Sequence, residues 1–428
     1  MTSPRTDTEA PVAAPVPVAP PFDPDALPVE HARNRIASLI APVRETEDIP
    51  LDQAHGRILA ADLLSTLDVP AHDNAAMDGY SLSASDLAAE GDTTLAIIGQ
   101  AFAGRAFHGE PQSGQAVRVM TGAVMPTGHD TVVPQEFVSV QGSSVVIPSG
   151  QRSGQNLRMR GEDLRRGEWA LRAGQRLGAA ECGLIASLGI ARVSVVRRLR
   201  VAILSTGDEL CAPGTPLVEG MIYDSNRSTL RALLGDLGVD LIDLGIVRDQ
   251  PDALERVIRD ASLSADAIIS SAGVSVGEAD HTRSVMQRLG SVEFWKIAMR
   301  PGRPLAFGRI GAALYFGLPG NPVAVMVTFL FLVRDALEAL SGGLPRPIPF
   351  VRARTAAPIR KRAGRTEYQR ATLHHDEAGV PVATVMANQG SAVLSSMSRA
   401  DCLVVLDHAS ESVPAGGWVQ CIPMRSLV

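Results

Sequence analysis

The side chains with the clearest chemical potential are concentrated in residues 266–322. An apolar run at 267–269 leads into a loop of small residues at 270–277. Such a loop can offer several backbone N–H groups and hydroxyls to a bound anion, because glycine lets the backbone approach closely. Charged side chains follow in the same stretch: Glu278, Asp280, Lys296, Arg300 and Arg303. Carboxylates beside fixed cations and a phosphate-cradling loop suit a phosphorylated ligand with bridging Mg²⁺, so we predict a site for both.

A second glycine turn closes this stretch at Pro319, Gly320 and Asn321. Asn321 precedes a long apolar helical pattern at 323–340, and asparagine is a favoured residue at the position before a helix. The two turns together supply these candidates for ligand binding: Ser271, Gly273, Ser275, Gly277, Pro319 and Asn321.

Alternating strands and helices in the second half of the chain would bring other polar loops to the same place. Short apolar strands are predicted at 201–204, 240–246 and 267–269, and helices at 226–237 and 252–261. Repeated β-loop-α units indicate a doubly wound parallel sheet, in which ligands bind at the carboxyl ends of the strands. We therefore expect one edge of the sheet to hold the residues that follow these strands: Ser205, Thr206, Gly207, Glu209, Asp249, Ser275 and Asp280.

Glycine-punctuated strand patterns lie on both sides of this α/β part. Residues 66–151 read as a small β-rich domain, and residues 345–428 as a small barrel or sandwich. Residues 1–28 contain eight prolines and too little apolar surface to fold, so we expect a disordered tail. The predicted fold is an α/β domain of the doubly wound parallel type combined with small β-rich domains and a C-terminal β-barrel-like domain.

Composition and missing motifs exclude several classes of protein. The net charge of −6 and the aromatic fraction of 4% argue against a nucleic-acid binder. The four cysteines show no CxxC pairing, and no apolar stretch approaches the ~20 residues of a membrane span, so we expect a cytoplasmic protein with reduced thiols. The chain has no GxSxG, Walker A or GxGxxG motif, which argues against serine hydrolases, P-loop NTPases and dehydrogenases.

A set of ordered motifs resembles the molybdopterin molybdenumtransferase family, the molybdenum insertases that are related to the E domain of gephyrin. The motifs are DNAAMDGY, RVMTGA, GEDLRRGE, ILSTGDEL, YDSN, RDQP, SAGVSVGEAD, FWKIAMRPGRP, GLPGNP and the C-terminal NQGSAVLSSMSRADCLVVL. The resemblance covers about residues 29–428. It implies a transferase that uses Mg²⁺ to place molybdenum from molybdate on adenylylated molybdopterin and to release AMP, as the last step of molybdenum cofactor biosynthesis.

The resemblance also implies a domain organisation and an assembly. A linking domain would be discontinuous (29–65 and 152–198) around the β-rich domain, followed by an α/β molybdopterin-binding domain (199–342) and the C-terminal domain. The family implies an elongated homodimer whose active site is shared, with the last domain coming from the partner subunit. Other cofactor-biosynthesis proteins or molybdoenzymes are further expected partners.

Site residues carry over position by position from this resemblance. Asp249 and Asp280 match acidic residues linked to Mg²⁺ and the adenylate, and Glu209 matches another active-site carboxylate. Lys296, Arg300 and Arg303 match the anion-binding turn. Functional positions in the other domains are matched by Asp73, Thr121, Asp163, Arg370 and Ser391, of which the last two resemble a molybdate-contacting pair.

Two departures from the family pattern stand inside the expected site. Ala272 replaces a usual glycine, which would strain the backbone if that position needs a positive φ. Arg300 and Arg303 stand where lysines are common, and arginine binds oxyanions through a fork rather than as a point charge. Three alternatives stay open: a non-catalytic scaffold of the gephyrin type, a molybdopterin adenylyltransferase, and a sugar-phosphate or nucleotide binder.

Overall fold

The computed structural model describes residues 25–273 and 281–426. The chain divides into two compact units. Unit 1 comprises Met1–Val43, Arg198–Ser341 and Pro345–Val428, and unit 2 comprises Arg44–Arg197 and Gly342–Leu344. The predicted loop residues Ser275, Gly277 and Asp280, and nearly all of the predicted tail, lie outside the described residues.

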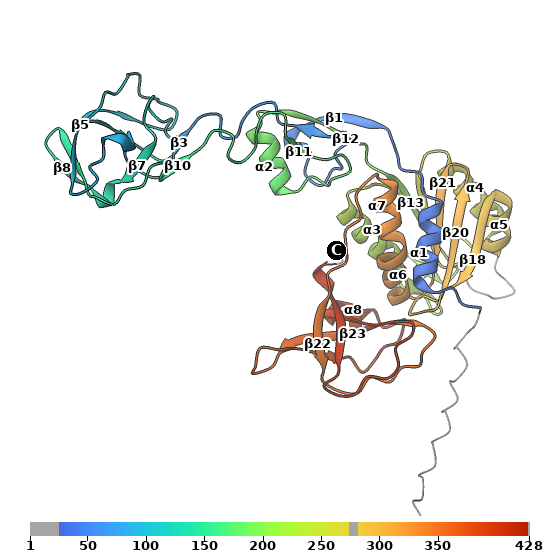
Figure 1. Ribbon diagram of the computed structural model, residues 1–428. Coiled ribbons are helices and arrows are strands. Elements are labelled where there is room, and N and C mark those ends of the chain that lie inside the picture. Colours follow the sequence, from blue (N-terminus) through green and yellow to red (C-terminus); the bar gives the residue numbers. More distant parts are fainter. Residues whose placement is uncertain (1–24, 274–280, 427–428) are drawn as a thin grey trace, which may run out of the picture. The chain divides into compact units, whose positions relative to one another are not determined.

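Unit 1 is built around a mixed six-stranded sheet (Figure 1). In spatial order its strands are β16 (Asp240–Val247), β13 (Arg200–Thr206), β17 (Ala267–Ser271), β21 (Ala313–Leu318), β20 (Pro304–Ile310) and β18 (Gly290–Lys296). The first four strands are parallel, and β20 and β18 complete the sheet in antiparallel register. After β13 the chain goes first to β16 on one side and then to β17 on the other. The strand order therefore reverses between β13 and β17, which is where ligands bind in open α/β sheets.

Helices cover both faces of this sheet (Figure 1). Alternate residues of β13 point to opposite sides, so Val201 and Ile203 join one core whereas Ala202 and Leu204 join the other. The first core is covered by α1 (Val29–Ser38), α3 (Ser225–Leu237), α6 (Pro322–Thr328) and α7 (Arg334–Leu340), and the second by α4 (Pro251–Ser262) and α5 (His281–Leu289).

The predicted helix at 323–340 is interrupted by one irregular turn. A π-helical segment, Phe329–Val333, separates α6 from α7 and is fully buried. Its Phe331 carbonyl accepts a hydrogen bond from Arg33 Nε of α1 at 3.1 Å. The Phe331 ring stacks on Tyr368, with 3.9 Å between ring centroids. This segment thus packs against both the N-terminal helix and the C-terminal part of unit 1.

The C-terminal part of unit 1 is a closed barrel of five strands. They are β23 (Thr366–His375), β24 (Pro381–Val385), β22 (Val351–Thr355), β26 (Trp418–Pro423) and β25 (Cys402–Leu406), and β25 pairs again with β23. A short strand from the α/β part, β19 (Met299–Arg300), adds to β23 in parallel. Barrel residues such as Tyr368 and Leu403 belong to the same apolar core as β13 and α3. The barrel and the α/β part therefore share one core.

Unit 2 contains a curled six-stranded sheet and several small elements. The sheet runs β7 (Thr131–Pro134), β4 (Gly79–Leu82), β6 (Gln115–Val119), β5 (Thr93–Ala101), β9 (Ser144–Ile147) and β8 (Ser139–Gln141). Three two-stranded ladders pair β1 (Thr46–Pro50) with β12 (Arg192–Val196), β2 (Leu63–Leu64) with β11 (Trp169–Leu171), and β3 (Asn74–Ala75) with β10 (Leu157–Arg158). Helix α2 (Ala179–Ser187) packs beside them and is followed by Gly189 at φ +70°, a conformation that favours glycine after a helix.

The predicted fold class is confirmed: a doubly wound α/β sheet, a curled β-sheet and a C-terminal barrel are all present. The finer division into five segments stays a prediction. One residue of the predicted tail, Leu27, is held in unit 1, because its N–H donates to Lys296 O at 2.7 Å and its carbonyl accepts from Ala298 N at 2.8 Å. The prediction of a disordered tail at residues 1–28 is therefore wrong at Leu27, and residues 1–24 lie outside the described residues.

Candidate active site

The carboxyl ends of the parallel strands meet at one edge of the unit 1 sheet. Register places Thr206 beside Val247, and Ser271 beside both Ser205 and Leu318. The loops that leave this edge carry Glu209 and Asp249, and the Asp249 N–H lies 3.4 Å from Asp208 Oδ1. The convergence of loops expected from the β-loop-α pattern is therefore present in the described part of the chain.

A cavity of about 870 Å³ opens beside this edge, between the α/β part and the barrel. That volume lies within the range of small-molecule sites. Seven predicted site residues line it: Glu209, Gly273, Arg300, Arg303, Pro319, Asn321 and Ser391. Arg365 lines it as well but is paired with Glu367 at 2.7 Å, so Arg300 and Arg303 supply most of the positive charge that faces Glu209. The cavity is cationic, as a site for phosphate or another oxyanion requires.

Ser391 of the barrel lies next to the second glycine turn of its own chain. The resemblance assigned the last domain's contribution to a partner subunit. Ser391 lines the cavity of its own chain, and its Oγ accepts a hydrogen bond from Asn321 Nδ2 at 3.0 Å. Its carbonyl also accepts from Val323 N at 3.0 Å. The barrel therefore lines this cavity within one chain, and a contribution of the partner subunit's last domain stays a prediction.

Three polar atoms at the sheet edge are buried and have no hydrogen-bond partner among the described residues. They are Thr206 Oγ1, Asn226 Oδ1 and Asp249 Oδ1. Buried polar atoms are normally satisfied, so such orphans point to an absent ligand. A buried carboxylate oxygen without a donor suits a hard cation, and Mg²⁺ takes one or two carboxylates together with phosphate oxygens. Asp249 therefore fits a Mg²⁺ ligand. Within residues 25–273 and 281–426, no group of three or more Asp, Glu, His or Cys residues could hold a metal by itself.

Glycine at position 207 makes room for the carboxylate of Glu209. A Cβ at this position would lie only 2.6 Å from Glu209 Oε2, and the backbone there has φ +149°. Any larger residue at 207 would therefore displace the carboxylate that lines the cavity.

Arg370 is a buried cation beside a second, smaller cavity. Its side chain is 1% exposed and no carboxylate of the described residues pairs with it. Nε donates to Ser396 Oγ at 3.0 Å and Nη2 donates to Gly390 O at 2.9 Å. Burial, and then the neighbouring Arg300 charge, lower the pKa of Arg370. A bound anion would offset both effects.

The smaller cavity measures about 110 Å³ and shares Arg300, Pro301 and Gln389 with the larger one. It is lined by Arg300 and Arg370 and also by Glu367, whose buried carboxylate is paired with Arg365 at 2.7 Å and lies 3.9 Å from Arg300. This volume is far below that of a nucleotide-sized site and suits a small anion. The two cavities therefore place a small-anion site next to a larger ligand site.

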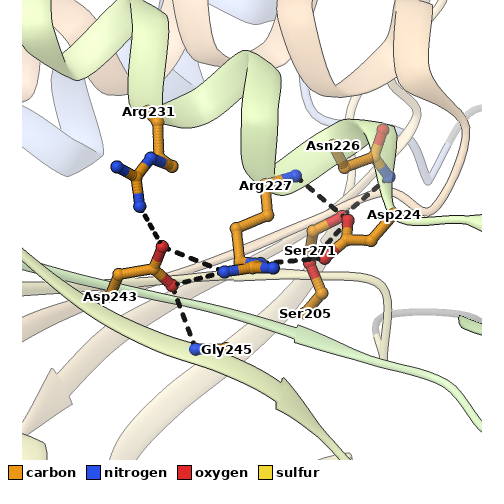
Figure 2. Close-up of polar contacts among 8 residues, drawn as sticks. All are labelled: Ser205, Asp224, Asn226, Arg227, Arg231, Asp243, Gly245 and Ser271. Carbon is orange, nitrogen blue, oxygen red and sulfur yellow. Dashed lines mark hydrogen bonds and ion pairs between the residues drawn. The ribbon is translucent and has the colours of Figure 1, made fainter. Parts of the chain in front are cut away.

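A network of polar side chains behind the sheet edge was not foreseen from the sequence (Figure 2). Asp224 occupies the position before α3, where its carboxylate accepts from Arg227 N at 3.1 Å and from Ser205 Oγ at 3.1 Å. Arg227 also donates to Asp243 of β16 at 3.0 Å. The motif YDSN contains Asp224 and Asn226, yet polar residues before a helix read as ordinary caps, so nothing in the sequence signalled this network.

The remaining predicted residues of unit 1 occupy other positions. The Ser205 hydroxyl is buried and donates to Asp224, and the Ser271 hydroxyl accepts from Asn226. Lys296 is exposed at the end of β18, immediately before the cavity-lining Ile297. Asn321 does take the position before α6, but its side chain donates to Ser391 instead of capping the helix.

Three predicted residues belong to unit 2. Asp73 Oδ1 accepts from Arg160 N at 2.7 Å. Both the N–H and the hydroxyl of Thr121 donate to Asp78 Oδ1 at 2.7 Å, and these bonds lower the pKa of Asp78. Asp163 is exposed, and its N–H donates to Val69 O at 3.0 Å. Their roles in a site stay predictions.

Ala272 adopts the backbone conformation that glycine favours. Its φ is +73°, and Gly273 follows at +72°. Since left-handed backbone costs an L-residue about 1–2 kcal/mol and glycine loses about 0.5–1 kcal/mol in chain entropy, we expect Ala272→Gly to stabilise unit 1 by about 0.5–1 kcal/mol. Urea unfolding measures this change.

Ala312→Gly is the matched control for this prediction. Ala312 lies in an exposed turn and is not at positive φ, so glycine there should lower the free energy of unfolding slightly. An Ala272→Gly variant that unfolds at lower urea than the parent would show that the left-handed strain is not present.

Comparison with known proteins gives concordant matches along nearly the whole chain. Residues 27–189 match the MoeA N-terminal region (domain I and II), residues 202–339 a probable molybdopterin binding domain, and residues 352–424 the MoeA C-terminal region (domain IV). The molybdopterin molybdenumtransferase of Haemophilus influenzae is 39% identical over 404 residues, which cover 94% of this chain and all of that protein. The protein of the same name from a Nostoc species is 38% identical over 91% of this chain and 92% of its own.

A solved structure shows the same fold. The molybdopterin biosynthesis moeA protein of Pyrococcus horikoshii OT3 superposes with a TM-score of 0.79 at 27% identity, covering 92% of this chain and 100% of that one. In the described part of this chain, no helix is both long and apolar enough to cross a membrane.

Proposed function

Because the chain belongs to the molybdopterin molybdenumtransferase family, we propose that it inserts molybdenum into molybdopterin as the last step of molybdenum cofactor biosynthesis. It is an enzyme of the transferase class. In the proposed reaction the substrates are molybdate and adenylylated molybdopterin, and the products are AMP and the molybdenum cofactor. The observation that carries the proposal is the cationic cavity of about 870 Å³, which adjoins a smaller cavity with a buried arginine.

The larger cavity would hold the adenylylated substrate. Gly273 and Pro319 bring backbone close to the ligand, and Arg303 supplies positive charge. Thr206 Oγ1, which lacks a partner among the described residues, would bond a phosphate oxygen. Ser275 and Gly277 lie outside the described residues, and their contact with the phosphates stays a prediction from the sequence. Lys296 would attract the anionic substrate from the rim.

Two carboxylates would hold Mg²⁺ on the pyrophosphate. Asp249 offers a buried oxygen without a donor, and Asp280 stays a prediction from the sequence. When bound, Mg²⁺ supplies Lewis acidity that stabilises the negative charge developing during cleavage of the phosphoanhydride. Glu209 lies at the cavity wall, where its carboxylate would orient a water or molybdate oxygen for in-line attack.

The smaller cavity would hold molybdate. Arg300 and Arg370 both line it, and Ser391 lines the larger cavity beside it. Guanidinium groups match oxyanions through paired N–H donors, so arginine at position 300 binds molybdate differently from a lysine. Molybdate would thus sit next to the molybdopterin that receives its metal.

A homodimer and a cytoplasmic location are also part of the proposal. The active site would be shared between the subunits, and the predicted residues Asp73, Thr121 and Asp163 of unit 2 would also take part in it. A scaffold role would leave ligand binding intact without turnover. Molybdate-dependent release of AMP from adenylylated molybdopterin tests the function directly.

A further inference from the structure

Asn226 joins two segments of the site that lie far apart in sequence. It stands in the first turn of α3, and its Nδ2 donates to Ser271 Oγ at 2.8 Å and to Gly320 O at 2.7 Å (Figure 2 shows the bond to Ser271). Because a backbone carbonyl can only accept, the bond to Gly320 fixes which end of the amide faces these two atoms. The side chain is therefore held in one orientation.

Both partners of Asn226 lead directly into the cavity. Ser271 ends β17 and is followed by Ala272 and Gly273, which line the cavity. Gly320 lines the cavity itself. The amide group of Asn226 thus sets the distance between the loop that begins at Ser271 and continues through Ala272 and Gly273 (the phosphate-side loop) and the second glycine turn.

The second glycine turn is in turn hydrogen-bonded to the barrel. Asn321 Nδ2 donates to Ser391 Oγ, and Val323 N donates to Ser391 O, both at 3.0 Å. The neighbouring Gly390 carbonyl accepts from Arg370 Nη2 at 2.9 Å. Hydrogen bonds, joined by the backbone steps 320–321 and 390–391, therefore connect Asn226 with the buried arginine of the small cavity.

Ion pairs hold the first turn of α3, which carries Asn226, against the sheet. Asp224 is 2% exposed and bonds Arg227, which in turn bonds Asp243 (Figure 2). Burial raises the pKa of Asp243, but hydrogen bonds from Arg227 and Arg231 outweigh it and hold that pKa below its ordinary value. The network keeps the start of α3 anchored to β16.

The other end of the Asn226 amide is destabilising. Its Oδ1 is buried and has no donor among the described residues, which costs folding free energy. We propose that Asn226 is a positioning residue that holds the phosphate-side loop and the barrel loop at 389–391 in register. The inference rests on the proposed function, since it assigns adenylate and molybdate to these two loops.

Two substitutions test the proposal in the full-length protein. Asn226→Asp keeps the shape but replaces the donor facing Gly320 O with an acceptor, and Asn226→Ala removes the group. We expect both to raise the half-saturating molybdate concentration roughly tenfold, the effect of losing one hydrogen bond at about 1.4 kcal/mol per factor of ten, with a smaller change in kcat. Ser228→Ala, an exposed substitution on the same helix, should change neither the half-saturating molybdate concentration nor kcat.

Hydrogen exchange separates positioning from general loosening. In Asn226→Ala, the peptide containing Val323 should exchange faster than in the parent, whereas peptides from 242–247 should not change. Equal acceleration in both regions, or unchanged exchange at Val323, would overturn the proposal. The hydrogen-exchange comparison requires no turnover. It therefore tests the positioning role of Asn226 even if the wild-type protein releases no AMP and the proposed function fails.

A double-mutant cycle gives an independent answer. If Asn226 acts through the second glycine turn, Asn226→Ala and Asn321→Ala share one path, and the combined loss in molybdate affinity should be no larger than the greater single loss. Additive losses would show that Asn226 acts elsewhere and would contradict the inference.

Discussion

Replacing Asp249 with asparagine is expected to lower turnover about 10²- to 10³-fold while leaving the fold intact. The range is that of removing one preorganised electrostatic contact from a transition state. Asp249 Oδ1 is buried and has no donor among the described residues, so the carboxylate gains no hydrogen bond there and its charge is available to a cation. Asparagine has nearly the same shape but no charge, so Mg²⁺ binding should weaken without loss of packing. Steady-state AMP release at a series of Mg²⁺ concentrations measures the effect.

Asp252→Asn is the matched control, because Asp252 is an exposed carboxylate in the first turn of α4, three positions along the chain. It should keep parental turnover. Asp280→Asn should behave like Asp249→Asn if the two carboxylates hold the same ion. Wild-type turnover with unchanged Mg²⁺ dependence in Asp249→Asn would remove Asp249 from the metal site. The thermal unfolding midpoint checks that the variant is folded.

Arg370→Lys is expected to raise the half-saturating molybdate concentration roughly 10- to 100-fold. Lysine keeps the charge but cannot reproduce the bonds from Nε to Ser396 Oγ and from Nη2 to Gly390 O. Hydrogen bonds of charged groups contribute about 1.5–3 kcal/mol each, which corresponds to this range. The loop at 388–390 would lose its support at the same time as the anion loses a fork of donors.

The molybdate dependence is the right measurement for Arg370, because a half-saturating concentration does not depend on the fraction of the sample that is folded. Arg354→Lys on the exposed side of β22 is the control and should leave the dependence unchanged. A folded Arg370→Lys protein with wild-type molybdate dependence would mean that the small cavity is not the molybdate site.

The sheet edge could be predicted from the sequence because strand order and loop position follow from short-range patterns. Apolar runs followed by polar loops and amphipathic helices placed Thr206, Glu209 and Asp249 at one edge, where the structure has them. The strain at Ala272 was also foreseen, but from the family resemblance, in which a glycine is usual at this position; Ala272 has φ +73°.

Contacts between distant segments could not be predicted in the same way. Asn226 meets Gly320 because α3 packs beside the end of β21, and Asn321 meets Ser391 because the sheet and the barrel share a core. Local patterns give asparagine near a helix start a capping role, and tertiary contacts replaced that role here. The π-helical turn at Phe329–Val333 has no periodic signal in a uniformly apolar segment.

The burial of Arg370 could have been predicted from the alternation of side chains along its strand. On β23 it lies two residues from Tyr368, and alternate residues of a strand share one face. Tyr368 is 5% exposed and stacks in the core, so the arginine on the same face is carried inward with it. An arginine in phase with core residues of a strand is a signal for a buried anion site.

The release of AMP from adenylylated molybdopterin, measured with Mg²⁺ in the presence and absence of molybdate, tests the central claim most directly. The proposed function predicts AMP release that requires molybdate and yields active molybdenum cofactor. Tight binding of the adenylylated substrate without AMP release would contradict it and would favour a scaffold role for this chain.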